Sequence, residues 1–491
     1  MVVRKEISMS GNGFCLDGIG SGPIGRRFRR SLLVLLAGAA TSPALAQTPP
    51  VPSPSVSAEI VGLRDSALKD TLAYSITQGL TTEVGQRLAG TEAEARARAW
   101  AVERLVGLGF KNVRVEEFAM PVWTRGPESA TIVAPFPQKL VVAALGNSAS
   151  TGPSGVTGQV VGFETLADLQ AAPDAAVRGK IVFISHAMPR TQDGSSYGYF
   201  GGPRRQGPAI ASAKGALAIV IRSIGTDYHR NPHTGVINFP PGVRPIPAGA
   251  LSLPDAEQLQ RILKRGQPVT LRLQLESQVT QGRSGNVIAE VPGRDPSLPM
   301  LLVGGHLDSW DLGTGAIDDA TGVAIAAAAA KRIMDAGRPL RTIRVVWFGA
   351  EEVGLFGGLD YQKRHGGEPY HAIAESDFGA GRIWKVDSKL GEARRGEARL
   401  LQAALAPLGI VPGSFDKADG SDIGPMLAAG VPGVGLSQDG TYYFDLHHTP
   451  DDTLDKVDPA ALQQNVAAWT TMLAVLSGGI EPHRRERGRR R

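Results

Sequence analysis

The chain has 491 residues, of which 42% are hydrophobic and 20% are charged, close to the usage of ordinary globular proteins. At about 100 to 200 residues per domain, this length predicts two or three domains and excludes a small fold that depends on cross-links. The formal net charge of +5 does not indicate a nucleic-acid partner, because the excess lies at the two ends. Residues 1–46 hold six Lys and Arg against two acids, residues 481–491 hold six against two, and the remainder holds 40 against 43. We therefore expect no nucleic-acid role.

The first 46 residues are typical of an export signal. Basic residues at 26–30 precede an apolar run from Leu32 to Ala40, and residues 44–46 form a small-x-small cleavage site. The run is short for a stable membrane span, so we expect a periplasmic or secreted protein without a stable anchor after cleavage, an uncleaved anchor being the alternative. The general and twin-arginine export routes both stay open. The only cysteine, Cys15, lies in this segment, so the mature chain would have neither disulfides nor cysteine ligands.

The first part of the body predicts helices and then a strand. After a Pro-rich linker at 47–54, residues 91–106 form an amphipathic pattern in which Thr91 and Glu94 have the spacing of a capping box. Residues 113–118 predict a strand. From about 120 to 281 the chain consists of short β-rich pieces separated by Gly and Pro, which predicts an inserted β-rich domain. Its clearest segments are 180–185, 209–216 followed by 217–221, and 269–275.

From residue 286 onward, strands alternate with helices. This order predicts an α/β fold, a three-layer sandwich with a mixed, largely parallel central sheet. The strands are continuous apolar runs, as expected for burial on both faces, and are predicted at 287–290, 300–304, 343–348 and 372–375. Helices are predicted at 320–334, 354–364, 399–408 and 459–476, the last with a cap residue and then proline at its start. Residues 47–119 and 282–480 would form one domain around the insert at 120–281, and residues 481–491 a disordered basic tail.

A metal site in a chain without available cysteine must use His, Asp and Glu, a donor set that suits zinc. His306 stands where the apolar run from residue 300 ends, and sites in open α/β sheets gather at the carboxyl ends of strands. Asp308 could accept the other ring N–H of His306, the usual arrangement around a ligating imidazole. Taken alone, a structural role is the commoner explanation for such a histidine.

Asp318 and Asp319 are the next candidates, because they open an Ala-rich helix directly after a Gly-rich loop. Capping of the helix explains one carboxylate but does not need both. The other could bridge two metal ions at about 3.5 to 4 Å from each other. A pair of adjacent acids at this place therefore favours a metal site.

Glu351 and Glu352 end the apolar run at 343–348. They are either solvated charges at the end of a strand, or one ligates metal while its neighbour accepts a proton from the attacking water. Asp377 follows the next apolar run, and the turn at 447–453 carries two histidines and two aspartates. These segments complete the candidate ligands.

Together, these segments resemble those of the co-catalytic dizinc exopeptidases, the family that includes aminopeptidases and glutamate carboxypeptidases. The resemblance spans about residues 58–476 and rests on ordered motifs at 232–235, 305–311, 350–352, 375–377 and 444–453. It implies the zinc exopeptidase fold, and it implies that the insert is a protease-associated domain. It further implies two zinc ions, one held by His306 and Asp377 and the other by Glu352 and His448, with Asp318 as the bridge.

The resemblance also implies the remaining roles. Glu351 would be the general base, Asp308 would orient His306, and the peptide bond between Asp318 and Asp319 would be cis. His448 is preferred over His447 because the family places its last ligand four residues before an Asp-Thr pair, here at 452–453. His447 stays the alternative.

Three residues are candidates for substrate binding. Tyr443 could stabilise the oxyanion of the reaction or simply pack, and Asp439 could shape the substrate pocket. His233 either faces the active-site cleft or lies on a surface loop.

We therefore expect a zinc-dependent exopeptidase that cleaves small peptides or dipeptides with a water activated by two metal ions. The alternative is a metal-dependent hydrolase or cyclase on the same scaffold with a non-peptide substrate. A binding protein without chemistry is disfavoured because Glu351 and the ligand set are complete. The charge of two zinc ions against three ligand carboxylates leaves a positive excess that suits a substrate carboxylate. The peptide end that is read, the native metal and assembly as a homodimer stay open.

Overall fold

The structure, a computed structural model, describes residues 54–483. The predicted export signal and the end of the predicted basic tail lie outside this range. The described part begins with three helices, α1 (Ala58–Ala67), α2 (Leu72–Gly79) and α3 (Glu92–Gly107). The Thr91 side chain accepts the backbone N–H of Glu94, so the helix predicted at 91–106 begins with half of the expected capping box. The Glu94 carboxylate accepts from Arg98 and Ser284 instead of Thr91.

A mixed sheet carries the candidate site. In spatial order its strands are β14 (Val411–Pro412), β13 (Ile383–Lys389), β15 (Gly433–Gln438), β12 (Tyr370–Glu375), β9 (Met300–His306), β11 (Ile343–Phe348) and β8 (Thr270–Val291). β15, β12, β9 and β11 run parallel to one another, whereas β13 is antiparallel to β15 and β8 is antiparallel to β11. β14 runs parallel to β13. The four strands predicted after residue 286 are all present, and the predicted α/β class with a mostly parallel sheet is confirmed.

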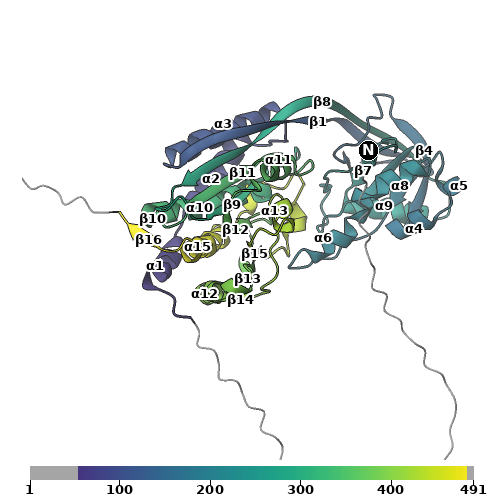
Figure 1. The fold of residues 1–491 in the computed structure, drawn as a ribbon. Coiled ribbons are helices and arrows are strands. Elements are labelled where there is room, and N and C mark those ends of the chain that lie inside the picture. The colour runs from purple at the N-terminus through teal and green to yellow at the C-terminus, as the bar shows by residue number, and fades with distance from the viewer. Residues whose placement is uncertain (1–53, 484–491) are drawn as a thin grey trace, which may run out of the picture. The chain divides into compact units, whose positions relative to one another are not determined.

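Helices cover both faces of this sheet (Figure 1). The first face packs against α1, α2, α3, α10 (Thr321–Ala336), α12 (Arg395–Leu405) and α15 (Pro459–Leu476), and the second against α11 (Phe356–His365) and α13 (Gly424–Ala428). Alternate side chains of one strand divide between the two cores: Val345 and Trp347 enter the first, whereas Val346 and Phe348 enter the second. This division explains the continuous apolar runs of the sequence.

The insert contains more helix than predicted. Its strands are β2 (Gln138–Leu140), β3 (Val142–Ala144), β4 (Val156–Phe163), β5 (Ile181–Ile184), β6 (Ala218–Arg222) and β7 (Ala248–Leu251), and its helices are α4 (Leu166–Ala171), α5 (Asp174–Val177), α6 (Ser195–Phe200), α7 (Gly202–Arg205), α8 (Gly207–Ala213) and α9 (Leu253–Leu263). Residues 209–213, expected among the β-rich pieces, belong to α8. Most of these helices are short and begin at or near Gly or Pro, so their sequences resemble turns between strands.

Two long antiparallel strands connect the insert to the sheet of the site. β1 (Lys111–Ala134) pairs with β8 from Lys111 opposite Glu290 to Ala134 opposite Thr270. Figure 1 shows both strands continuing from the site-bearing sheet into the insert. The strand predicted at 113–118 is therefore only the beginning of β1.

The end of the described chain differs from the prediction. Residues 480–482 form β16 (Ile480–Pro482), which pairs with β10 (Gly337–Pro339), so the expected disordered tail does not begin at 481. Among the helices that the structure describes, none combines the length and apolar character that a membrane crossing requires.

Candidate metal centre

The candidate ligands gather where parallel strands end. His306 is the last residue of β9, Glu351 and Glu352 follow β11, and Asp377 follows β12. Because these three strands are parallel neighbours, their carboxyl ends lie at one edge of the sheet. Asp318 lies in the turn Ala316–Ala320 before α10, and the histidine pair at 447–448 follows α14 (Tyr443–Leu446).

The five predicted ligands come together as two groups that share Asp318. In the first group, His306 Nε2 lies 2.9 Å from Asp318 Oδ1 and 3.3 Å from Asp377 Oδ1. In the second, His448 Nε2 lies 3.2 Å from Asp318 Oδ2 and 2.8 Å from Glu352 Oε2. Asp318 thus directs one carboxylate oxygen to each group.

The chemistry of this cluster fits divalent cations. Asp318 Oδ2 is buried and has no hydrogen-bond partner among the described residues. Burial and the neighbouring Asp318 raise the pKa of Glu352 to about 7, because buried carboxylates without enough positive charge are unfavourable. His306, Asp318 and Glu352 each offer a ligand atom within 4.8 Å of the others, and His306, Asp319 and Asp377 do the same. Imidazole and carboxylate donors together suit zinc.

Asp308 supports the cluster in a way that differs from the prediction. His306 Nδ1 donates to the backbone carbonyl of Asp308 at 3.0 Å, whereas the carboxylate Oδ1 is 3.6 Å away. The two carboxylate oxygens instead accept the backbone N–H groups of Glu351 at 3.1 Å and Glu352 at 3.3 Å. Two residues after the strand end, the carbonyl rather than the side chain lies beside the imidazole. The carboxylate turns to the end of the neighbouring strand β11.

The peptide bond between Asp318 and Asp319 is cis, as the resemblance implies. Asp319 caps α10, the role that we expected for one acid of the pair. Its Oδ1 accepts the N–H of Gly322 at 3.0 Å. Its Oδ2 also accepts the N–H of His306 at 3.0 Å, a link between the end of β9 and the turn before α10 that the sequence did not predict.

Asp452 was also missed as a site residue. Its carboxylate accepts the backbone N–H groups of Ile317 at 2.7 Å and Asp318 at 3.2 Å. Burial, followed by the charge of Asp318, raises the pKa of Asp452 to about 7. The Asp-Thr pair at 452–453 could have identified this residue from the sequence. We used the pair only to choose His448 as the last predicted ligand.

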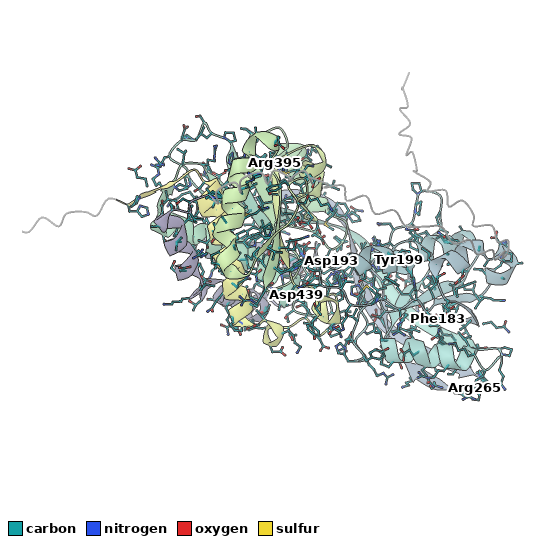
Figure 2. The ribbon with its side chains drawn as sticks, turned by 90° about the horizontal axis from the view of Figure 1, so that it is seen from below. Phe183, Asp193, Tyr199, Arg265, Arg395 and Asp439 are labelled. Carbon is teal, nitrogen blue, oxygen red and sulfur yellow. The ribbon has the colours of Figure 1, made fainter. Side chains whose placement is uncertain are left out.

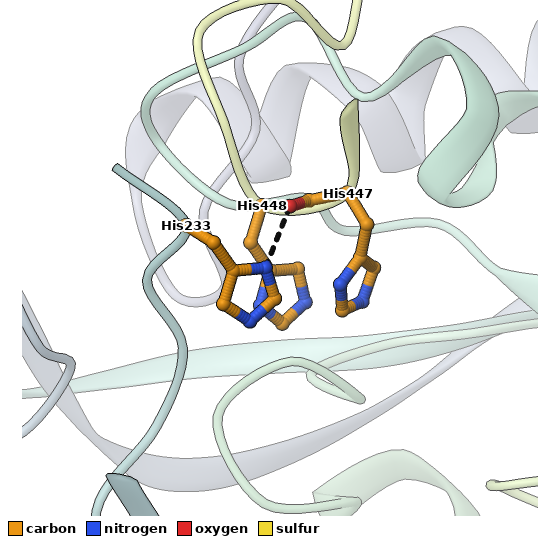
Figure 3. Close-up of side chains that lie close together, drawn as sticks. All are labelled: His233, His447 and His448. Atoms are coloured by element: carbon orange, nitrogen blue, oxygen red, sulfur yellow. Dashed lines mark hydrogen bonds between the residues drawn. The ribbon is translucent and has the colours of Figure 1, made fainter. Parts of the chain in front are cut away.

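The two adjacent histidines, His447 and His448, differ in their contacts. Figure 3 shows their side chains. His448 Nδ1 donates a hydrogen bond to the Thr234 carbonyl at 3.2 Å. The other ring nitrogen, Nε2, faces Asp318 and Glu352 and is left free to bind a metal ion. His447 Nε2 lies 3.1 Å from Asp318 Oδ2, but its Nδ1 is buried without a hydrogen-bond partner in residues 54–483. The geometry therefore favours His448.

His233 is completely buried, which excludes the surface-loop alternative. Its Nδ1 donates to the His447 carbonyl at 2.8 Å, the dashed contact in Figure 3. Its ring lies 4.9 Å from that of His448 with an interplanar angle of 15°. The other ring nitrogen is 3.2 Å from the hydroxyl of Tyr197. His233 thus supports the histidine pair from the side of the insert.

A cavity of about 490 Å³ opens over the cluster. It is lined by residues outside the insert, namely Asp318, Glu351, Glu352, Asp377, Tyr443 and His448, and by residues of the insert, namely Tyr197, Arg204, Val236 and Asn238. Glu351 is partly exposed. A second cavity of about 690 Å³ shares Tyr197, Asp377 and Phe378 with the first.

Tyr443 and Asp439 differ in their relation to this cavity. Tyr443 lines it, and its ring lies 4.7 Å from that of His447. Asp439 lies outside the lining and borders a separate cavity of about 370 Å³. Its carboxylate accepts the side-chain amide of Gln192 at 2.9 Å, and Figure 2 labels it together with Asp193, the next residue of the insert.

Comparison with known proteins agrees with the geometry. The model of peptidase family M28 matches residues 286–473. Carboxypeptidase Q from Bos taurus is 33% identical over 431 residues, covering 86% of this chain and 89% of that protein. The chain belongs to peptidase family M28. It is therefore a member of a metallopeptidase family, and the resemblance seen in the motifs is confirmed over most of the chain.

Solved structures extend the M28 assignment to the fold. An M28 peptidase precursor from Shewanella amazonensis SB2B is 44% identical and superimposes with a TM-score of 0.83, covering 86% of this chain and 98% of that chain. A zinc aminopeptidase from Bacillus subtilis is 20% identical, with a TM-score of 0.60 and coverage of 83% and 97%. At that identity the likeness concerns the fold. The relative at 33% identity is thus a carboxypeptidase, whereas the aminopeptidase is a neighbour in fold only.

Proposed function

We propose that this M28 chain is a zinc-dependent exopeptidase that hydrolyses small peptides or dipeptides at a pair of metal ions. One observation carries the proposal: His306, Asp318, Glu352, Asp377 and His448 meet at one sheet edge with Asp318 between two groups. One ion would be held by His306 and Asp377, the other by Glu352 and His448, and both by Asp318. The donor set and the zinc aminopeptidase with the same fold favour zinc.

When bound, two such ions would lower the pKa of a nearby water and polarise the peptide carbonyl. Glu351 is the residue of this chain best placed to move the proton. It lies in the cavity wall next to the ligand Glu352 but outside the ligand set. We assign to it the acceptance of the proton of water and its return to the leaving amine. Asp308 holds both acids in place through their consecutive N–H groups.

The remaining parts have supporting roles in this proposal. Tyr443 lines the cavity and would donate its O–H to the developing oxyanion. The insert would be the protease-associated domain, which narrows the cavity over the cluster with Tyr197 and Arg204. A space of about 490 Å³ suits a substrate of few residues. Export to the periplasm or the medium remains part of the proposal on the basis of residues 1–46.

Metal analysis of the purified protein, run beside a panel of dipeptides, N-blocked peptides and C-amidated peptides, tests this function. We expect two zinc ions per chain, hydrolysis of free dipeptides, loss of activity with a chelator and recovery with zinc. A zinc-loaded protein that cleaves no peptide would support the alternative, a hydrolase or cyclase with a non-peptide substrate. Full activity of the metal-free protein would overturn the mechanism.

A further inference from the structure

Ser421 contacts one of the proposed metal ligands directly. Its hydroxyl donates a hydrogen bond to Asp377 Oδ2 at 2.8 Å. The other oxygen of this carboxylate, Oδ1, lies 3.3 Å from His306 Nε2, within the first ligand group. Ser421 is half-buried and lines both the cavity over the cluster and the larger cavity beside it. The hydroxyl therefore occupies one oxygen of Asp377 and leaves the other for a metal ion.

Glu352, the acid of the second ligand group, is held in the same way. Its Oε1 accepts the backbone N–H of Trp310 at 3.1 Å, and its Oε2 lies 2.8 Å from His448 Nε2. Asp318 differs, because the hydrogen bonds and ion pairs of its carboxylate within residues 54–483 involve histidine nitrogens alone. Each acid assigned to a single ion thus has one oxygen bound by a donor of the protein, whereas the shared acid directs both oxygens to histidines.

The loop that carries Ser421 is held by the first acid of the motif at 375–377. The two carboxylate oxygens of Glu375 accept the backbone N–H groups of Asp422 and Ile423, both at 3.2 Å. Both oxygens of Glu375 are therefore engaged with the loop rather than with the ligand groups. The motif supplies a ligand and, two residues before it, the support for the residue that contacts this ligand.

Two glycines allow the loop to lie close to its neighbours. Asp422 Oδ1 accepts the backbone N–H of Gly358 in α11 at 3.0 Å, and a Cβ atom at Gly358 would overlap the Asp422 carbonyl oxygen. A Cβ atom at Gly420 would lie 2.6 Å from Glu375 Oε2. Close packing on both sides of the loop therefore fixes where the Ser421 side chain lies.

We propose that Ser421 is a positioning residue of the metal centre, which binds Asp377 Oδ2 and so directs Oδ1 to the ion held with His306. The proposal rests on the proposed function, from which it takes the metal ligands. A hydrogen bond from a hydroxyl to an ionised carboxylate is stronger than one between neutral groups, and ligating carboxylates depend on such partners for their orientation. Because a backbone amide holds Glu352, Ser421 is the side chain through which a single substitution affects one ion and not the other.

Zinc titration of the metal-free protein in competition with a chromogenic chelator tests this role. We expect the wild type to bind two ions, and Ser421→Ala to bind one of them about 10- to 100-fold more weakly, the usual effect of losing a partner of a metal ligand. Ser421→Thr keeps the hydroxyl and should restore most of the affinity. Ser437→Ala is the matched control, because Ser437 is also half-buried but lines only the larger cavity of the two. It should bind both ions like the wild type.

Two further variants identify the ion that Ser421 affects. Glu352→Gln leaves the ion of His306 and Asp377 to be measured, and adding Ser421→Ala should weaken it by the same factor of about 10 to 100. Asp377→Asn leaves the ion of the second group, and adding Ser421→Ala should change its affinity by less than about twofold. A larger change in the Asp377→Asn background, or equal weakening of both ions by Ser421→Ala alone, would show a general loosening of the site and would overturn the proposal.

Kinetics at saturating zinc separate this role from contact with the substrate. Once both ions are bound, Ser421→Ala should hydrolyse the best dipeptide of the panel with kcat and KM close to those of the wild type. Wild-type zinc affinity together with a raised KM would make Ser421 a substrate-binding residue and would contradict its positioning role. A wild type that binds two zinc ions but cleaves no peptide would refute the proposed peptidase function alone, since the zinc affinities are measured without turnover.

Discussion

The carboxylate of Asp452 accepts the backbone N–H of Asp318 at 3.2 Å, although 134 residues separate the two in sequence. Its other oxygen accepts the N–H of Ile317 at 2.7 Å. Asp318 is the carboxylate shared by the two proposed ligand groups. Asp452, which is not a proposed ligand, therefore fixes the backbone from which the bridging side chain extends.

Asp452→Asn should weaken zinc binding by about 10- to 100-fold, the usual effect of losing a residue that positions a metal ligand. The amide has a single oxygen for two N–H groups, so one of them loses its acceptor. Competition with a chromogenic chelator measures the affinity. Asp455→Asn is the matched control, since Asp455 is exposed. If the Asp452 variant binds zinc as tightly as the wild type, Asp452 does not position Asp318 for metal binding.

Replacing Glu351 and Glu352 separately should distinguish the base from the ligand. Glu351→Gln should keep the zinc content and lower kcat by about 10²- to 10⁴-fold, the contribution typical of a general base. Glu352→Gln should lose bound zinc because a ligand is removed. Elemental analysis and kcat are measured on the same preparations. Wild-type turnover in Glu351→Gln would refute its role as the base.

The two adjacent histidines should differ in the same kind of measurement. His448 Nε2 faces both Asp318 and Glu352, whereas His447 Nε2 lies close to only one of the ligand carboxylates, that of Asp318. We expect His448→Gln to hold less zinc per chain than the wild type and His447→Gln to hold the same amount. The reverse pattern would make His447 the ligand, the alternative that the sequence left open.

A pH effect on stability is expected away from the metal centre. His365 Nε2 lies 2.8 Å from Glu116 Oε2, and Nδ1 lies 2.9 Å from Glu368 Oε1. Burial opposes ionisation, but the contacts with His365, together with Arg114 at Glu116 and Arg344 at Glu368, outweigh it and lower the pKa of both carboxyl groups below 4.5. A lowered pKa in the folded state stabilises the protein above the unfolded-state pKa, and this stabilisation is lost as the pH falls through the folded-state pKa.

His365→Gln should therefore be less stable than the wild type at pH 7, and the difference should shrink below about pH 4.5. Urea unfolding between pH 3 and pH 7 measures the free energy of unfolding of both proteins. Lys363→Gln, an exposed position on the same helix, is the control. A difference that stays constant with pH would attribute the effect of the variant to packing rather than ionisation.

Several elements could be predicted because their signals are local. α15 begins at Pro459 and ends at Leu476, as predicted, since a cap, a proline and a long apolar stretch are adjacent in sequence. β13 and β15 were not predicted. β15 is short and rich in glycine, and β13 contains charged residues, so neither is a continuous apolar run even though both belong to the central sheet.

The sequence by itself determined the residue types of the candidate metal centre, the strand ends that carry His306, Glu352 and Asp377, and the α/β class, because each depends on patterns of a few neighbouring residues. It did not reveal that Asp308 binds two amides of the next strand end, that Asp452 holds the backbone of Asp318, or that Arg204 of the insert lines the cavity over the cluster. Only the tertiary structure decided these points. Asp452 and Asp318 are 134 residues apart, and Arg204 and His448 are 244 residues apart. Hydrophobic patterns and helix caps act over single elements, whereas these contacts depend on how parallel strands and the insert are placed against one another.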